Sequence, residues 1–430
     1  MAVITLIIYA VFLLVSFSIH RKLSRPTVMF NLIWTVLIAI STSGILGITI
    51  PEGKIYKFFL IGGISFNLML GLLNFGERQS ILRYKSRSHK KIITNKVKYI
   101  LVLTLNIIMF VYYVYKGVRL IEKFGLSADA YLFVRGYYYS TENFDSTFEY
   151  NMVMFLFDPM LYVNSTIFAI NLFDRKYKPF TLSLMFINLI LRMLISGGRM
   201  IVFELGLCIL LAYLHTHTKR KRIKLSKSQK RKKRMMYGLL AIAIVGATYV
   251  TVLRAGQSSL FEGNALVTLL SNFTGSFSYL GIMQKYGLYY PKKLFGRATF
   301  AGLLDPFIMI GRYLGITRVD ITQNALGTIL SEFFHIGKLS YNAMPTMYYF
   351  FISDYRRFGL IIGPALLAIY TFIADLRKRK NFTYKNFALY ILAMLIIVES
   401  PMMWLPFKTS FIVANFLTAF LLSSDKINKE

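Results

Sequence analysis

The chain has 430 residues, of which 56% are hydrophobic and 16% aromatic, and its formal net charge is +32. An ordinary soluble domain does not combine so apolar a composition with so large a charge, so that class is excluded. A membrane protein combines them readily, because apolar segments of about 20 residues cross the bilayer as helices and basic residues collect in the connections. The single cysteine, Cys208, argues against a disulfide-stabilised scaffold.

In chain order, the apolar segments predict about eleven membrane-spanning helices. They cover residues 2–19, 27–49, 57–75, 99–116, 151–173, 179–196, 200–214, 235–253, 358–374, 387–405 and 409–423. Two long segments, 117–150 and 254–355, separate some of these spans. In the second, apolar residues at helical spacing predict a helix over 265–283 that either lies on the membrane or crosses it. We therefore expect an all-α, polytopic protein with a single membrane domain over residues 1–430.

Clusters of lysine and arginine follow alternate spans, the largest being "KRKRIKLSKSQKRKKR" at 219–234. Such clusters stay on the cytoplasmic side of a membrane, which places the N-terminus and both long segments outside and the C-terminus inside. In isolation these clusters also resemble nucleic-acid-binding patches. Each one directly adjoins an apolar span, so we expect a lipid bilayer and no nucleic acid as partner.

The sequence "SGGR", at Ser196–Arg199, interrupts an apolar segment that runs from residue 179 to 214. That segment has the length of two spans joined by a tight turn, in which the two glycines permit the backbone to reverse. Arg192 and Glu204 lie six residues on either side of Gly198, at a depth of about 9 Å in a helical hairpin. Charged residues inside a membrane are costly without a partner, so we expect these two to pair. Structural bracing and ligand contact are both open roles for them.

Further arginines occur where the positive-inside rule predicts few of them. They are Arg135, Arg199, Arg254, Arg297, Arg312, Arg356 and Arg357. A guanidinium group holds phosphate with two parallel hydrogen bonds, so the set suggests an anionic lipid or diphosphate ligand, while unspecific contact with lipid head groups stays open for each arginine. Two carboxylates, Asp158 and Asp354, are candidates either for a general base or for structural hydrogen bonding.

Several common chemistries have no motif in this sequence. We find no Walker-type glycine loop, no H-E-x-x-H and no G-x-S-x-G. We therefore expect no metal and no cofactor, and energy for any reaction has to come from the substrate itself.

Two segments of the chain resemble the Wzy-like oligosaccharide repeat unit polymerases, or O-antigen polymerases. They are "SGGR" at 196–199, similar to the glycine-arginine turn of the family, and "YNAMPTMYYFFISDYRRFGLIIG" at 341–363. In the second, Tyr355, Arg356 and Arg357 separate the aspartate from the Phe-Gly that directly follows it in the family. The resemblance implies a GT-C-like glycosyltransferase on the outer face of the bacterial cytoplasmic membrane, working without metal or nucleotide.

The reaction implied is transfer of a glycan from undecaprenyl diphosphate to a sugar hydroxyl of a second lipid-linked repeat unit, which builds a capsule, exopolysaccharide or O-antigen. Such a leaving group needs charge stabilisation, which arginines provide. We therefore expect Arg199, Arg254 and Asp354 at the reacting groups. The residues expected to hold substrate are Arg135, Arg192, Glu204, Arg297, Arg312, Tyr341 and Asn342. A flippase of the same lipids and a glycan ligase remain as alternatives, and a chain-length regulator and a flippase are expected partners.

Overall fold

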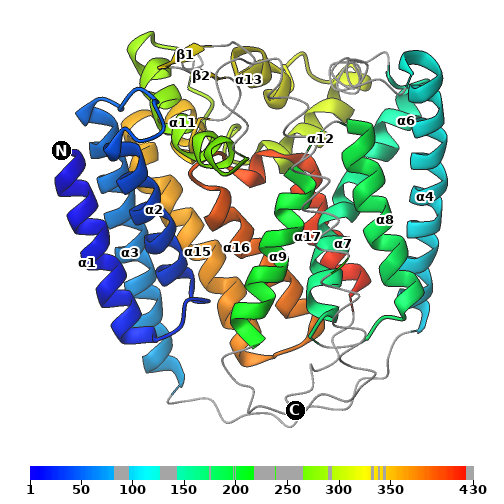
Figure 1. The fold of residues 1–430 in the computed structure, drawn as a ribbon, viewed down its shortest axis with the longest axis horizontal. Helices are drawn as coiled ribbons and strands as arrows, with labels where there is room; N and C mark the ends of the chain where they lie inside the picture. The colour runs from blue at the N-terminus through cyan, green and yellow to red at the C-terminus, as the bar shows by residue number, and fades with distance from the viewer. Residues whose placement is uncertain are drawn as a thin grey trace. The chain divides into compact units, whose positions relative to one another are not determined.

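The computed structural model of the chain describes residues 1–81, 96–125, 143–173, 176–196, 198, 200–216, 238, 265–288, 293–330, 334–337, 339–341 and 345–422. These residues are mostly helical, and their one sheet is a two-stranded hairpin (Figure 1). Seven helices within this part of the chain are long and apolar enough to cross a membrane. The prediction of an all-α, polytopic membrane protein is therefore confirmed.

The chain is divided into two compact units, and each unit combines segments that are distant in the sequence. Unit 1 comprises Met1–Lys90, Leu266–Lys380 and Ala393–Ile412, and unit 2 comprises Lys91–Ala265, Asn381–Leu392 and Val413–Glu430. The subdivision therefore runs across the expected single domain and cuts through the last two helices, α16 (Tyr384–Glu399) and α17 (Thr409–Leu421).

Unit 1 contains a group of four neighbouring helices and a set of shorter elements (Figure 1). The four helices are α1 (Ala2–His20), α2 (Pro26–Ser43), α3 (Gly53–Ile81) and α15 (Gly359–Lys380). The others are α11 (Ala265–Lys285), α12 (Ala301–Tyr313), α13 (Thr322–Leu330), β1 (Phe334–Ile336), β2 (Leu339–Tyr341), α14 (Met347–Tyr355), η4 (Arg356–Phe358) and η5 (Leu405–Phe407). The described part of segment 254–355 thus contains four helices and a short hairpin, and α11 covers the helix expected at 265–283.

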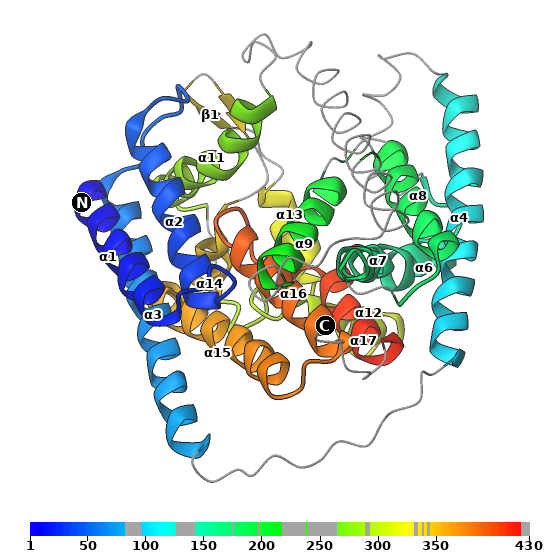
Figure 2. The same ribbon diagram turned by 60° about the horizontal axis from the view of Figure 1, so that its bottom comes forward.

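Unit 2 contains helices from the middle of the chain that pack against one another (Figure 2). They are α4 (Lys96–Phe124), α6 (Thr147–Met152), the π-helix η2 (Val153–Phe157), α7 (Asp158–Asn171), α8 (Pro179–Ser196) and α9 (Met200–Thr216). α8 packs against both α4 and α7, and α9 packs against α7 and α8.

Several helix boundaries differ from those predicted, each for a local reason. α2 ends at Ser43 instead of residue 49, because Gly44 adopts a left-handed conformation with φ of 67°. α4 continues to Phe124, since apolar residues recur beyond Lys116, and this shortens the segment expected at 117–150. The span predicted at 235–253 lies outside the described residues, apart from Gly238.

α15 also extends beyond its predicted end at residue 374, to Lys380, because its charged last turns are neutralised within unit 1. Asp375 contacts Arg25 at 2.6 Å and both Lys378 and Arg379 at 2.8 Å. Arg379 additionally holds Glu77 of α3 through two bonds of 2.9 and 2.6 Å. This network joins α3 and α15 to the start of α2.

The core of unit 1 is aromatic and depends on glycine. Trp34 of α2 stacks on Phe277 of α11, with ring centroids 5.5 Å apart and planes inclined by 4°. On α3, a Cβ atom at Gly62 would lie 2.0 Å from the Tyr348 hydroxyl. A Cβ atom at Gly63 would likewise lie 2.5 Å from the Tyr9 hydroxyl. The glycine pair therefore lets two buried tyrosine side chains approach the backbone of α3.

Candidate functional site

The charged residues of α7 and α8 form a two-point ion pair in unit 2. Arg192 lies one turn before the end of α8, and its Nε and Nη2 donate to Asp158 Oδ1 and Oδ2 at 2.9 and 3.1 Å. The Arg192 side chain is 6% exposed and that of Asp158 is 27% exposed. This parallel geometry is the strongest form of arginine–carboxylate contact, so it fixes how α7 and α8 face each other.

Asp158 owes its position to an irregular backbone. The residue after it, Pro159, has no amide hydrogen to continue the helical ladder, and the five residues before it form a π-helix, Val153–Phe157. π-Helices are rare and occur frequently at functional sites. The sequence "FLFDPML" thus places a carboxylate at the junction between two helix types.

Glu204 of α9 is buried but uses a different partner from the one we predicted. Tyr162 of α7 donates its hydroxyl hydrogen to Glu204 Oε1 at 3.3 Å, and Glu204 is 7% exposed. The residue held by the Arg192 guanidinium is Asp158 of α7. α7 therefore supplies a contact to each member of the predicted Arg192–Glu204 pair.

Three buried asparagines connect α4, α7 and α8. Asn106 Oδ1 accepts hydrogen bonds from Asn164 at 2.8 Å and from Asn188 at 3.0 Å, and all three residues are 0% exposed. Asn188 lies four residues before Arg192, so the two share one face of α8. Hydrogen bonds between membrane helices of this kind fix helix rotation, which here keeps Arg192 directed at α7.

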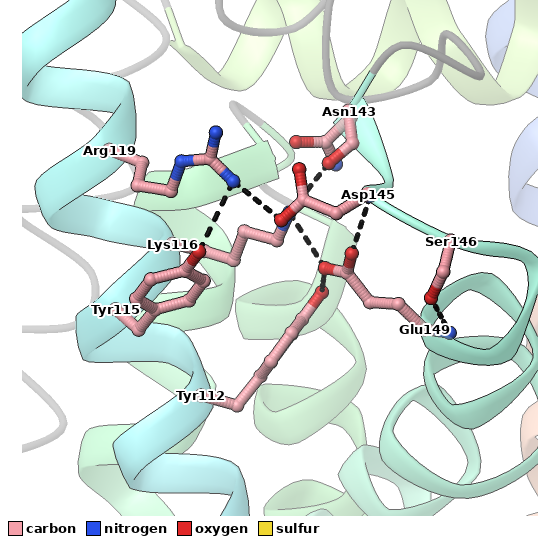
Figure 3. Close-up of polar contacts among 8 residues, drawn as sticks. All are labelled: Tyr112, Tyr115, Lys116, Arg119, Asn143, Asp145, Ser146 and Glu149. Atoms are coloured by element: carbon pink, nitrogen blue, oxygen red, sulfur yellow. Dashed lines mark hydrogen bonds and ion pairs between the residues drawn. The ribbon is translucent and has the colours of Figure 1, made fainter.

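A second charged cluster, the Lys116 cluster, lies at the end of α4 (Figure 3). The buried Lys116 Nζ donates to the Asn143 carbonyl oxygen at 2.6 Å and lies 2.7 Å from Glu149 Oε1. Tyr112 donates to the same Glu149 oxygen at 2.8 Å. Arg119 adds an exposed bond of 2.5 Å to Asp145. These contacts attach the residues just before α6 to α4.

The Lys116 cluster adjoins a variant of the capping box at "STFE", Ser146–Glu149, in which Glu149 caps the residue before the N-cap. Ser146 Oγ accepts from the Glu149 amide at 3.1 Å, while Glu149 Oε2 accepts from the Asp145 amide at 2.7 Å. Asp145 lies just before α6, and the hydrogen bond from Arg119 lowers the pKa of its carboxyl below the ordinary value. The S-x-x-E signature, together with a lysine ending an apolar span, could have predicted this cluster.

Several predicted site residues lie outside the residues that the structure describes. They are Arg135, Arg199, Arg254 and Asn342. Of the turn "SGGR", the structure describes Ser196, the last residue of α8, and Gly198, whose amide donates to Ser196 Oγ at 3.2 Å. The roles expected for these arginines therefore remain predictions.

Asp354, expected at the reacting groups, is a buried structural acceptor in unit 1. Its Oδ1 accepts from the Ala298 amide at 2.9 Å, and its Oδ2 accepts from the Thr299 amide at 2.6 Å and the Thr299 hydroxyl at 2.5 Å. It is 0% exposed. These three bonds hold the loop at Ala298 and Thr299, as expected for structural hydrogen bonding, and the role of Asp354 as a general base stays a prediction.

The loop that Asp354 fixes carries Arg297. Arg297 donates to the carbonyl oxygen of Asp320, and Arg312 lies 3.5 Å from the Asp320 carboxylate. Arg297 and Arg312, both predicted to hold substrate, thus contact the same residue, Asp320. Tyr341 lies in β2, where its backbone pairs with Phe334.

The described residues contain no group of three or more His, Cys, Asp or Glu side chains that could hold a metal ion. Comparison with protein-family models, with characterised proteins and with solved structures finds no match. The candidate site therefore rests on its own geometry, a two-point Arg192–Asp158 pair between α8 and α7 and the buried Glu204 on α9.

Proposed function

We propose that this protein is a membrane glycosyltransferase that polymerises oligosaccharide repeat units carried on undecaprenyl diphosphate, on the outer face of the bacterial cytoplasmic membrane. The glycosidic bond to the diphosphate of the donor breaks, and the sugar anomeric carbon bonds to a hydroxyl oxygen of the acceptor unit. The hydroxyl proton passes to solvent water, and the lipid diphosphate departs with the electron pair.

The observation that supports this proposal most is the Arg192–Asp158 pair with Glu204, in α8, α7 and α9. Ionisable groups inside a membrane protein are costly and generally mark a functional region. Arg192 and Glu204 lie on α8 and α9, the helices before and after Arg199, and Asp158 lies on α7, which packs against both. Departure of a diphosphate needs fixed positive charge more than it needs a proton, and a rigid hairpin holds a guanidinium without reorganisation during the reaction.

In this proposal the residues have distinct roles. Arg199 and Arg254 stabilise the leaving diphosphate, and Arg135 contacts the sugars or the second diphosphate. Arg192, Asp158 and Glu204 are positioning residues of the hairpin. Asp354 positions the loop that carries Arg297, because its oxygens already accept hydrogen bonds from Ala298 and Thr299.

The experiment replaces Arg199 or Arg254 by Ala in the native host and examines the length of the surface glycan. We expect single repeat units to reach the surface without long chains. Arg377→Ala is the matched control, because it removes an exposed arginine from the expected cytoplasmic end of α15 and should leave chain length unchanged.

Two other outcomes would contradict the proposal in identifiable ways. Lipid-linked units that accumulate inside the cell would indicate a flippase. Long chains that remain on the lipid carrier and are missing from their final acceptor would indicate a ligase. Unchanged chain length in both variants would remove these arginines from the site.

A further inference from the structure

The helix α12 buries a charged residue on one face and exposes a line of large apolar residues on the other, the reverse of a helix on a water-facing surface. Its residues with the lowest exposure include Ala301, Gly302 and the charged Asp305, which is 3% exposed. The opposite face carries Leu303, Phe307, Ile310 and, directly after the helix, Leu314, at 40, 67, 53 and 62% exposure. These four follow a spacing of four, three and four residues, so they form one continuous line, the α12 stripe. A helix that faced water on this side would carry polar residues there.

The direction in which the stripe points is fixed by contacts on the other face. A Cβ atom at Gly302 would lie 2.6 Å from the carbonyl oxygens of both Pro406 and Lys408, so only glycine fits against that backbone. Asp305 accepts hydrogen bonds from the amides of Thr322 and Gln323 at 3.0 and 2.8 Å, at the start of α13. α12 is thus held from behind, and its apolar line faces away from unit 1.

The residues around the stripe fit a lipid surface. Lys293, Arg297, Arg312 and Arg318 lie within residues 293–320, where the only carboxylates are Asp305 and Asp320. Tyr313, at the end of α12, is 90% exposed, and Ile316 beyond it is 77% exposed. Apolar side chains on one face, an excess of cations in the same segment and an aromatic residue at the end describe a helix lying in a membrane interface. A candidate membrane span, Met347–Lys380, follows later in the chain.

We propose that α12 lies parallel to the membrane in its lipid–water interface, with Leu303, Phe307, Ile310 and Leu314 among the acyl chains and Arg318 at the lipid phosphates. The occupant of the stripe is the phospholipid bilayer in which the chain itself is embedded. This inference does not depend on the proposed glycosyltransferase reaction, since it rests on the polarity of one helix. It assigns a surface function to a segment expected to lie in a loop outside the membrane.

The test measures which solvent reaches the stripe. Phe307→Cys and Ile310→Cys are each labelled with a nitroxide in the full chain, which is then reconstituted in nanodiscs of phosphatidylcholine and phosphatidylglycerol. Asn324→Cys, an exposed polar position on α13, is the control. These positions are exposed, so folding should be retained, and the natural Cys208 is 0% exposed and is checked for labelling in the parent chain.

We expect labels at 307 and 310 to collide with dissolved oxygen, which concentrates in lipid, more than with a water-soluble nickel chelate, and the label at 324 to show the reverse. Equal access of the chelate to 307, 310 and 324 would overturn the proposal. Dipolar broadening at 307 and 310 that disappears on mixing with unlabelled protein would also overturn it, because a second copy of the chain would then cover the stripe.

Discussion

Arg192 and Asp158 illustrate at the scale of single residues how a charge is tolerated between membrane helices. The Arg192 side chain is 6% exposed and the Asp158 side chain 27%, so removing either partner leaves an unpaired charge that is at least partly buried. We expect Arg192→Met alone to lower the free energy of unfolding by about 3 kcal/mol. The double variant Arg192→Met, Asp158→Leu should recover most of this loss, since apolar replacement of a whole buried pair is often neutral.

The measurement is denaturation of the purified variants in one detergent, with Arg192→Lys as a further control for the two-point geometry. Lysine keeps the charge but cannot reproduce the parallel bonds, so its loss should be intermediate. A double variant as unstable as Arg192→Met would show that Arg192 acts through some contact other than Asp158.

Lys116 and Arg119 offer a matched comparison within the Lys116 cluster, because they occupy neighbouring turns of α4 and both contact Asp145. The Lys116 side chain is 4% exposed and the Arg119 side chain 48% exposed. Loss of Lys116 leaves Glu149 in a buried position without its cation, so Lys116→Ala should cost about 3 kcal/mol. Arg119→Ala should cost about 0–1 kcal/mol, as is usual for exposed pairs.

Thermal unfolding of both variants in nanodiscs distinguishes them. Equal losses would mean that burial does not govern the strength of these contacts. As a second readout, Lys116→Ala should increase hydrogen exchange at the amides of Asp145 and Glu149, because Lys116 contacts the carboxylate that caps the start of α6.

The sequence predicted that Arg192 and Glu204 are buried ionisable residues, but it could not identify their partners. Their pairing was inferred from equal distance to Gly198 in a hairpin of α8 and α9 alone, whereas α7 packs against both helices. Asp158 is 34 positions from Arg192, and no local pattern connects residues at that separation. For Asp354 the sequence left a general base and structural hydrogen bonding open, because its hydrogen-bond donors, at Ala298 and Thr299, become apparent only when the loop is folded.

At the scale of elements, glycines govern how closely helices approach. A Cβ atom at Gly359, the first residue of α15, would lie 2.1 Å from the carbonyl oxygen of Phe351 in α14. Backbone cannot move as easily as a side chain, so Gly359→Ala should destabilise the protein by about 1–3 kcal/mol. Gly71→Ala in α3 is the control, because a Cβ atom at Gly71 would have no neighbour within 4 Å and alanine favours helix by about 1 kcal/mol.

Melting temperatures of the two variants should therefore move in opposite directions. A Gly359→Ala protein with unchanged stability would show that the contact between α14 and α15 is loose.

Helices could be predicted where an apolar segment has the length of a span and is bounded by residues that begin or end a helix, such as proline and glycine. α8 begins at Pro179 and ends at Ser196 as expected, because proline opens it and the two glycines close the apolar segment. The hairpin of β1 and β2 was missed, since each strand has only three residues, and α14 was missed because it lies in a segment interpreted as a loop. Such short elements depend on tertiary contacts rather than on local periodicity.

For the whole molecule, the basic segments predict the orientation in the membrane. In a chain whose natural cysteine is buried, Ser127→Cys should react with a membrane-impermeant maleimide in intact bacterial protoplasts or spheroplasts. Ser226→Cys should react only after the cells are permeabilised, because it lies in the most basic segment, 219–234. The opposite pattern would invert the topology and remove the arginines of the two long segments from the outer face.

The π-helix Val153–Phe157 connects the two charged clusters of unit 2. Glu149, which holds Lys116, precedes it, and Asp158, which holds Arg192, directly follows it. A π-helix turns the chain by a smaller angle per residue than an α-helix, so five π-helical residues rotate it about as far as four α-helical ones. Removing one residue here would favour an α-helical path on which Glu149 and Asp158 keep nearly the same directions. The wide turn before Pro159 therefore holds one surplus residue, and the two clusters keep their alignment with or without it.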